Sequence, residues 1–144
     1  MEKPRIISGE FEEKTQGIIT YNNDFDMKEV KRGFVIAPSS EYVQREWHGH
    51  KIEQNWFYPI SGLFLILVVV PDDWKNPSFS IKPLEYIIAA EKNEVLHIPA
   101  GYVTKIKALK ENSRLMVYSN FTLEESLKDD YRFQSEIWDY GTYF

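Results

Sequence analysis

The chain has 144 residues, carries a net charge of −5 and contains no cysteine. The lack of cysteine excludes disulfides and thiolate metal sites, and the negative charge argues against a broad basic surface for nucleic acid. The longest apolar run, residues 63–70, is far shorter than the roughly 20 residues of a membrane-spanning helix, and no signal-peptide pattern follows the N-terminus. We therefore expect one cytoplasmic domain over residues 1–144, without nucleic-acid or membrane partners.

The first half of the chain predicts short strands separated by turns. Residues typical of strands occur at 17–21, 30–37, 42–50 and 54–60. Ser61 and Gly62 then predict a tight turn into residues 63–70. Every residue of that run is apolar, which predicts a strand covered on both faces.

The second half continues this pattern after a loop at residues 71–77. Further strands are predicted at 86–89, 95–98, 102–109 and 115–119. Only residues 122–129 predict a helix, with a capping box formed by Thr122 and Glu125. Short strands at regular spacing indicate a sandwich or closed barrel. The aromatic tail, residues 131–144, is expected to pack on the body or on a second subunit.

His48 and His50 are two of the three histidines in the chain. Residues two apart in a strand point to the same face, so both imidazoles should project together. Such a pair suits either a metal or paired proton transfer, and the alternative is two hydrogen-bonded histidines on a solvated face. The third, His97, stands among apolar residues and is interpreted as structural.

Two segments of the sequence resemble the motifs of the cupins. The first is Arg45-Glu46-Trp47-His48-Gly49-His50-Lys51 with Gln54 and Ile60-Ser61-Gly62, and the second is Leu96-His97-Ile98-Pro99-Ala100-Gly101-Tyr102. The chain is most similar in these motifs to the RmlC-like cupins, which include the dTDP-4-dehydrorhamnose 3,5-epimerases and the dTDP-sugar 3,4-ketoisomerases with the WxcM-like proteins. The resemblance covers residues 17–133. It implies an all-β double-stranded β-helix, or jelly-roll barrel, with one short C-terminal helix.

The departures from these motifs narrow the expected chemistry. In metal-binding cupins three or four residues separate the second histidine from a glutamate, and a further histidine follows the Pro-x-Gly turn. Here only two residues separate His50 from Glu53, and Thr104 takes the place of the last histidine. Two imidazoles alone make a poor zinc or iron site, so we expect no metal and no cofactor. The 3,5-epimerases also share a lysine, expected to stabilise an enolate oxygen, at the position where this chain has Asn55 and Trp56. The absence of this lysine favours the ketoisomerases.

The resemblance implies that His48 and His50 are catalytic. Moving a ketone between C4 and C3 of a hexose through an enediol needs proton transfer at both carbons and both oxygens, and imidazole is suited to that work at neutral pH. His48 would be the carbon base, and His50 would be the second proton carrier.

Seven further residues are candidates for substrate binding, each with a structural alternative: Arg32, Arg45, Arg114, Gln54, Trp56, Tyr58 and Tyr102. The arginines suit a diphosphate, or else ordinary salt bridges. Gln54, Trp56 and Tyr58 share one face of a strand. Their aromatic side chains could stack on a sugar or a base, and the alternative is that they fill the core. Tyr102 could donate a hydrogen bond to a sugar oxygen, or pack at the barrel mouth.

The function expected from these residues is that of a metal-independent isomerase or epimerase, with a 3,4-ketoisomerase favoured over a 3,5-epimerase. Its substrate would be a nucleotide-linked 4-keto-6-deoxy hexose, with dTDP as the expected nucleotide, in surface polysaccharide biosynthesis. The alternative is a non-catalytic cupin that binds a sugar or nucleotide sugar. Relatives of this kind look like dimers that exchange N-terminal strands, and Phe11 and the aromatic C-terminus are apolar enough to be covered. A homodimer is therefore expected.

Overall fold

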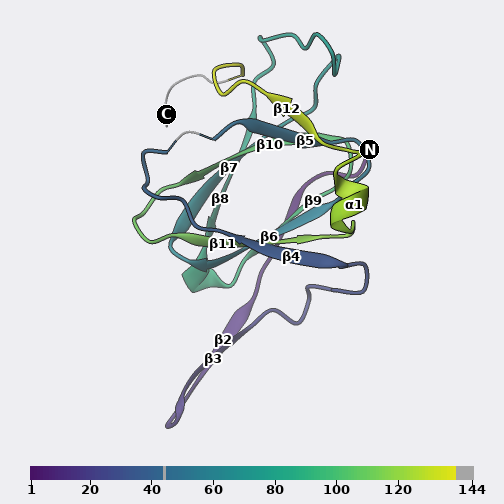
Figure 1. Ribbon diagram of the computed structural model, residues 1–144. Helices are drawn as coiled ribbons and strands as arrows, with labels where there is room; N and C mark the ends of the chain where they lie inside the picture. Colours follow the sequence, from purple (N-terminus) through teal and green to yellow (C-terminus); the bar gives the residue numbers. More distant parts are fainter. Residues whose placement is uncertain (44, 139–144) are drawn as a thin grey trace.

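Ten of the strands form two antiparallel five-stranded sheets, which face each other in the computed structural model (Figure 1). The structure describes residues 1–43 and 45–138. In spatial order, the first sheet contains β1 (Arg5–Ile7), β9 (Val95–Ile98), β6 (Asn55–Ser61), β11 (Arg114–Ser119) and β4 (Arg32–Ile36). The second contains β12 (Tyr131–Phe133), β5 (Trp47–His50), β10 (Tyr102–Ala108), β7 (Leu63–Val69) and β8 (Leu84–Ala89). The predicted all-β sandwich is confirmed.

The remaining elements are short. β2 (Glu10–Lys14) and β3 (Gly17–Tyr21) form a separate hairpin, and η1 (Ala90–Lys92) is a single 3₁₀ turn. α1 (Leu123–Ser126) begins at the predicted capping box, in which the Thr122 side chain accepts from the Glu125 amide and the Glu125 side chain accepts from the Thr122 amide. The predicted helix was three residues too long at its C-terminal end, because the chain turns there toward β12. Among the described residues, no helix is long and apolar enough to span a bilayer.

The strand predicted at residues 42–50 is shorter in the structure and begins only at Trp47. Of the preceding residues, 42, 43, 45 and 46 lie outside any strand and most of them are exposed, and residue 44 lies outside the described part of the chain. β1, β2 and β12 were not predicted. β1 and β12 have three residues each and form only by pairing with distant strands, β9 and β5 respectively.

β7 has the double-sided burial that its apolar sequence predicts. Phe64, Ile66 and Val68 belong to the core between the two sheets. Leu65 and Leu67 pack on the outer face of the second sheet, in a cluster with Trp47 and Trp138. Each such side chain removed from water contributes about 1.5–3 kcal/mol. The long central strand therefore fixes the second sheet on which β10 and β5 are built.

The hairpin of β2 and β3 projects away from the sandwich (Figure 1). All five residues of β2 are exposed, and β3 exposes both Ile18 and Ile19. Phe11 is 60% exposed on the neighbouring strand. A two-stranded hairpin is marginally stable by itself in water, so these apolar side chains need a surface to cover them.

Candidate functional site

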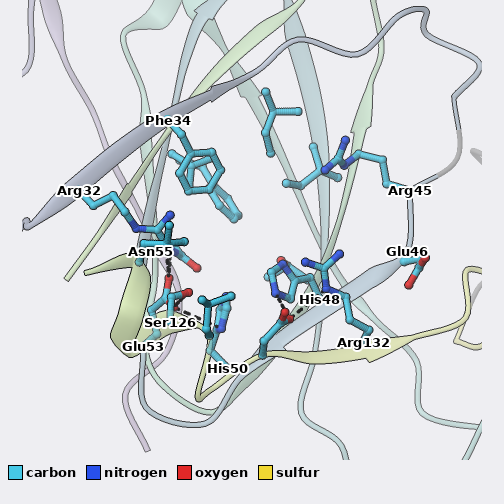
Figure 2. A pocket seen from close by; sticks show the side chains of 18 of the residues that line it. Arg32, Phe34, Arg45, Glu46, His48, His50, Glu53, Asn55, Ser126 and Arg132 are labelled. Atoms are coloured by element: carbon cyan, nitrogen blue, oxygen red, sulfur yellow. Dashed lines mark hydrogen bonds and ion pairs between the residues drawn. The ribbon is translucent and has the colours of Figure 1, made fainter. Parts of the chain in front are cut away.

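A cavity of about 510 Å³ opens between the two sheets (Figure 2). Its walls come from β4, β5, β6, β10 and β11, with further side chains from α1, β12 and the segment before β5. Apolar groups line one part, among them Phe34, Phe57 and Ile106. Ionisable groups line the rest, so the cavity offers both an apolar wall and a charged one.

β5 places both histidines in this cavity, as the sequence predicts. Its side chains alternate, so that Trp47 is fully buried on the outer face of the sheet while His48 and His50 face inward. The two imidazole centroids are 4.5 Å apart with the rings tilted by 56°. Two proton carriers therefore stand side by side within the reach of one small molecule.

His50 is held in one tautomer by a backbone carbonyl. Its Nδ1 lies 2.8 Å from the carbonyl oxygen of Asp129. A carbonyl oxygen can only accept, so the proton of the neutral ring must be on Nδ1, from which it is donated. The other nitrogen, Nε2, then carries the lone pair of a base.

His48 has the opposite arrangement. Its Nε2 lies 2.6 Å from Oδ1 of Asp130, an ion-pair distance at an angle outside hydrogen-bond geometry. Burial lowers the pKa of His48 to about 4, helped by the charges of His50 and Arg132 and opposed by Asp130. Although burial tends to raise the pKa of Asp130, contacts with Arg132 and His48 outweigh it and lower that pKa. At neutral pH, an uncharged imidazole thus stands beside a charged carboxylate.

This depressed pKa predicts how stability depends on pH. The unfolded chain takes a proton on His48 near its ordinary pKa of about 6.5, whereas the folded chain resists until about pH 4. The unfolded state therefore binds more protons as the pH falls from about 6.5 to 4, and the free energy of unfolding should decrease across that window. The His48→Asn variant should lose less stability than wild type between pH 7 and 4.5 in urea titrations. Equal losses in the two proteins would contradict the low pKa.

The segment between α1 and β12 holds the end of the histidine strand. The carboxylate of Asp129 accepts from the backbone amides of Lys51, Ile52 and Glu53 at 2.8–2.9 Å. Asp129 is 5% exposed. Because the same residue also holds His50, one aspartate fixes both the imidazole and the chain that leaves β5.

Glu53 lies in the cavity wall beside His50 and is 2% exposed. Its Oε1 is 3.5 Å from Nδ1 of His50, the nitrogen that already donates to Asp129. Within residues 1–43 and 45–138, no three His, Asp or Glu side chains are arranged to hold a metal ion. The structure shows a contact of Glu53 with the imidazole of His50.

Three arginines line the cavity: Arg32, Arg45 and Arg132. Arg32 lies 3.7 Å from Glu53 and over the ring of Phe34, while Arg132 donates to Asp130 at 3.0 Å. In Figure 2, Arg32 and Arg45 lie on opposite sides of the cavity. Arg45 reaches it from the irregular segment before β5, where strand alternation does not apply.

The structure places the other predicted binding residues outside the cavity. Gln54 contacts Nε2 of His97 at 2.8 Å, and Trp56 stacks on the same imidazole. Tyr58 packs with Trp56 in the cluster on the outer face of the first sheet. These three side chains have the opposite direction to Asn55 and Phe57, which line the cavity from the same strand. His97 is buried, in agreement with its structural interpretation.

Tyr102 and Arg114 are also not among the residues that line the cavity, although Tyr102 is the cross-strand partner of His50. Tyr102 belongs to the core between the sheets, and its hydroxyl donates to the carbonyl oxygen of Glu2 at 2.7 Å. Arg114 is exposed at the start of β11, opposite Ser61 across a bulge.

Several groups that line the cavity or hold His50 were missed by the sequence analysis: Glu53, Asn55, Ser126, Asp129, Asp130 and Arg132. Glu53 was considered only as a badly spaced metal ligand. The C-terminal residues reach the site because β12 pairs with β5, in a register that sets Arg132 opposite His48. A run of charged residues directly after a capped helix was the one local signal for them.

No family model and no curated protein matches the sequence. Solved structures do match. The sugar 3,4-ketoisomerase QdtA from Thermoanaerobacterium thermosaccharolyticum, in complex with TDP, is 20% identical, with 98% of this chain and 91% of that chain covered and a TM-score of 0.65. The TDP-quinovose 3,4-ketoisomerase WlaRB from Campylobacter jejuni is 17% identical, with 99% and 98% covered and a TM-score of 0.66.

The rmlC epimerase from Mycobacterium tuberculosis is a third structural match. It is 14% identical, with 88% of this chain and 66% of that chain covered and a TM-score of 0.68. At these identities the likeness is one of fold. The fold expected from the two sequence motifs, that of the RmlC-like cupins, is therefore confirmed.

Proposed function

We propose that this chain, with its RmlC-like cupin fold, is an isomerase of a nucleotide-linked 4-keto-6-deoxy hexose. The observation that carries the proposal is the pair of cavity imidazoles 4.5 Å apart, each with one ring nitrogen beside an acceptor. Moving the ketone from C4 to C3 needs two proton carriers, one for the carbons and one for the oxygens. Neighbouring imidazoles in a cavity supply both.

The charged wall supports a diphosphate as part of the ligand. Guanidinium groups bind phosphate oxygens through paired hydrogen bonds, and Arg32, Arg45 and Arg132 all line the cavity. Structural relatives agree with this ligand class, since QdtA was crystallised with TDP, and a histidine-to-asparagine variant of QdtA was crystallised with TDP-4-keto-6-deoxyglucose. We therefore take TDP-4-keto-6-deoxyglucose as the first substrate to test.

The fixed tautomer of His50 supports a division of labour that reverses the one expected from the sequence. Nε2 of His50 has a lone pair and takes the proton from C3, the C–H electrons form a C3–C4 double bond, and the π electrons of the C4 carbonyl move to O4. The proton of the O3 hydroxyl passes through His48 to O4, so the negative charge of the enediolate moves from O4 to O3. Return of the His50 proton to C4 and re-formation of the carbonyl at C3 give the 3-keto sugar.

Isomerisation is favoured over 3,5-epimerisation by the groups in the cavity. The related epimerases resemble one another in a lysine that is expected to stabilise an enolate oxygen. Among the lining residues that the structure describes, none is a lysine, and Asn55 lies in the wall next to Glu53. Epimerisation is the second outcome that the same experiment would detect.

The experiment is incubation of TDP-4-keto-6-deoxyglucose with the protein in D₂O, followed by NMR. We expect a 3-keto sugar to appear, with deuterium at C4 of this product and at C3 of the remaining substrate. Deuterium at C3 and C5 without ketone migration would show epimerisation. Tight binding of TDP without any exchange would show a non-catalytic sugar-nucleotide-binding cupin and would refute the proposed activity.

We also propose that the chain forms a homodimer through the β2–β3 hairpin. The hairpin exposes Phe11, Ile18 and Ile19 without covering them itself. An Ile18→Asp, Ile19→Asp double variant should therefore shift light scattering from the dimer to the monomer mass. Ile60→Asp, which changes an exposed apolar residue on the sandwich, should leave the dimer intact. A wild-type monomer at micromolar concentration would contradict this proposal.

A further inference from the structure

Among the described residues that line the cavity, Glu53 is the most deeply buried ionisable group. Oε1 accepts from the hydroxyl of Ser126 at 2.5 Å. Oε2 accepts from the hydroxyl of Ser119 at 2.8 Å and from the amide of Asn55 at 3.1 Å. These donors come from α1, β11 and β6, so elements far apart in the sequence meet at one carboxylate. Figure 2 shows Asn55 and Ser126 beside Glu53.

This carboxylate faces the back of the His50 imidazole. Oε1 lies 3.5 Å from Nδ1, on the side of the ring opposite to the proposed base, Nε2. When Nε2 gains a proton, the ring becomes a cation, and its charge is shared with Nδ1. A negative charge that is 2% exposed and held by three donors acts on that cation with little screening by water.

Arg32 limits the cost of a buried carboxylate in a site for an anionic ligand. Its Nη2 lies 3.7 Å from Oε2 of Glu53, and its guanidinium also lines the cavity. The arginine thus balances the charge of Glu53 while it faces the space where a diphosphate would bind. Removing the carboxylate would remove its repulsion of an anionic ligand, which raises affinity. It would also remove the contact that positions Arg32, which lowers affinity, so the two effects oppose each other.

We infer that Glu53 is a positioning residue for His50: it holds the Nδ1 side of the imidazole and stabilises the cation formed when Nε2 takes the substrate proton. This inference rests on the proposed function for its catalytic part. The position of the carboxylate against Nδ1 is independent of any substrate. The two parts can therefore be measured separately.

The catalytic part is tested with the Glu53→Gln variant, which keeps the shape and removes the charge. With TDP-4-keto-6-deoxyglucose, we expect kcat to fall on the order of 10- to 100-fold, less than removal of the base itself, and KM to change by less than about threefold. Glu53→Asp keeps the charge and should recover part of kcat. Glu111→Gln makes the same charge change in an exposed turn and should match wild type.

Unchanged kcat in Glu53→Gln would overturn the inference, as would a parallel loss of kcat and thermal stability that Glu53→Asp does not relieve. The structural part is tested by long-range ¹H–¹⁵N NMR of the His50 ring without ligand. We expect both proteins to show the Nδ1–H tautomer that the Asp129 carbonyl fixes, with the Nδ1 ¹⁵N resonance shifted in Glu53→Gln because the charge beside Nδ1 is lost. If wild type fails to act on the sugar, the proposed function fails. Identical His50 spectra in wild type and Glu53→Gln would overturn the inference about Glu53, whether or not the sugar is a substrate.

Discussion

Replacing His50 with asparagine should lower the rate of deuterium uptake at C3 of TDP-4-keto-6-deoxyglucose by about 10²- to 10⁴-fold, the usual contribution of a positioned general base. The reason is the fixed tautomer of His50, whose Nδ1 donates to the Asp129 carbonyl and leaves Nε2 as the free base. Affinity for TDP, measured by calorimetry, should stay within a few fold. His48→Asn should slow product formation more than exchange at C3, because its proposed work is on the oxygens.

The third histidine offers a matched control for this experiment. His97 is stacked on Trp56 outside the cavity, so His97→Asn should exchange the C3 proton at the wild-type rate even if it melts earlier. Full exchange in both His48→Asn and His50→Asn would assign the two histidines to binding or packing. Loss of exchange in His48→Asn alone would restore the order of roles expected from the sequence.

The largest effect on stability is expected at Asp129. In Asp129→Asn, one carboxylate oxygen that accepts backbone amides becomes an NH₂ group that faces them, and the negative charge is lost. Hydrogen bonds to charged groups are worth about 1.5–3 kcal/mol each, and a buried donor left unpaired costs a similar amount. We expect the free energy of unfolding, measured in urea by tryptophan fluorescence, to fall by about 3 kcal/mol.

An exposed aspartate provides the comparison. Asp26 accepts a single backbone amide, that of Lys28, at the surface. Asp26→Asn should therefore cost less than about 1 kcal/mol. Equal losses in Asp26→Asn and Asp129→Asn would show that the three amides of residues 51–53 find other partners.

The sequence predicts much of the sandwich because its signals are local. The apolar run that became β7, the turn at Gly62 and the capping box at Thr122 each depend on neighbouring residues, and all three are present in the structure. The shared face of His48 and His50 also follows from strand geometry alone. β1 and β12 carry no such signal, since three residues are too few for a pattern.

The face of β6 could not be predicted, because both of its faces are covered by side chains. Phe57 packs between the sheets, whereas Trp56 is buried outside them beneath Phe25. An alternating aromatic pattern is equally compatible with either direction. Only the position of the strand in the first sheet decides that Asn55 lies in the cavity and Gln54 does not.

The charged half of the site was hidden for a different reason. Asp130 and Arg132 lie some eighty residues after the histidines in the sequence, and they come near His48 through the pairing of β12 with β5. Glu53 could be seen in the motif, but its partners Ser119 and Ser126 are also distant in sequence. A single sequence gives the residue types of this network and leaves its contacts open.

Gly49, the residue between the two histidines, lies against Trp74 and Val103 on the outer face of β5. A Cβ atom there would come within 2.7 Å of Val103 and 2.9 Å of the Trp74 ring. Trp74 in turn contacts Tyr131, and the ammonium group of Lys51 lies over both rings. Substitutions in the loop at residues 71–77 can therefore alter the distance between the two imidazoles, because Trp74 packs on the opposite face of β5. A search for altered substrate preference could begin in this loop, although it lines no part of the cavity.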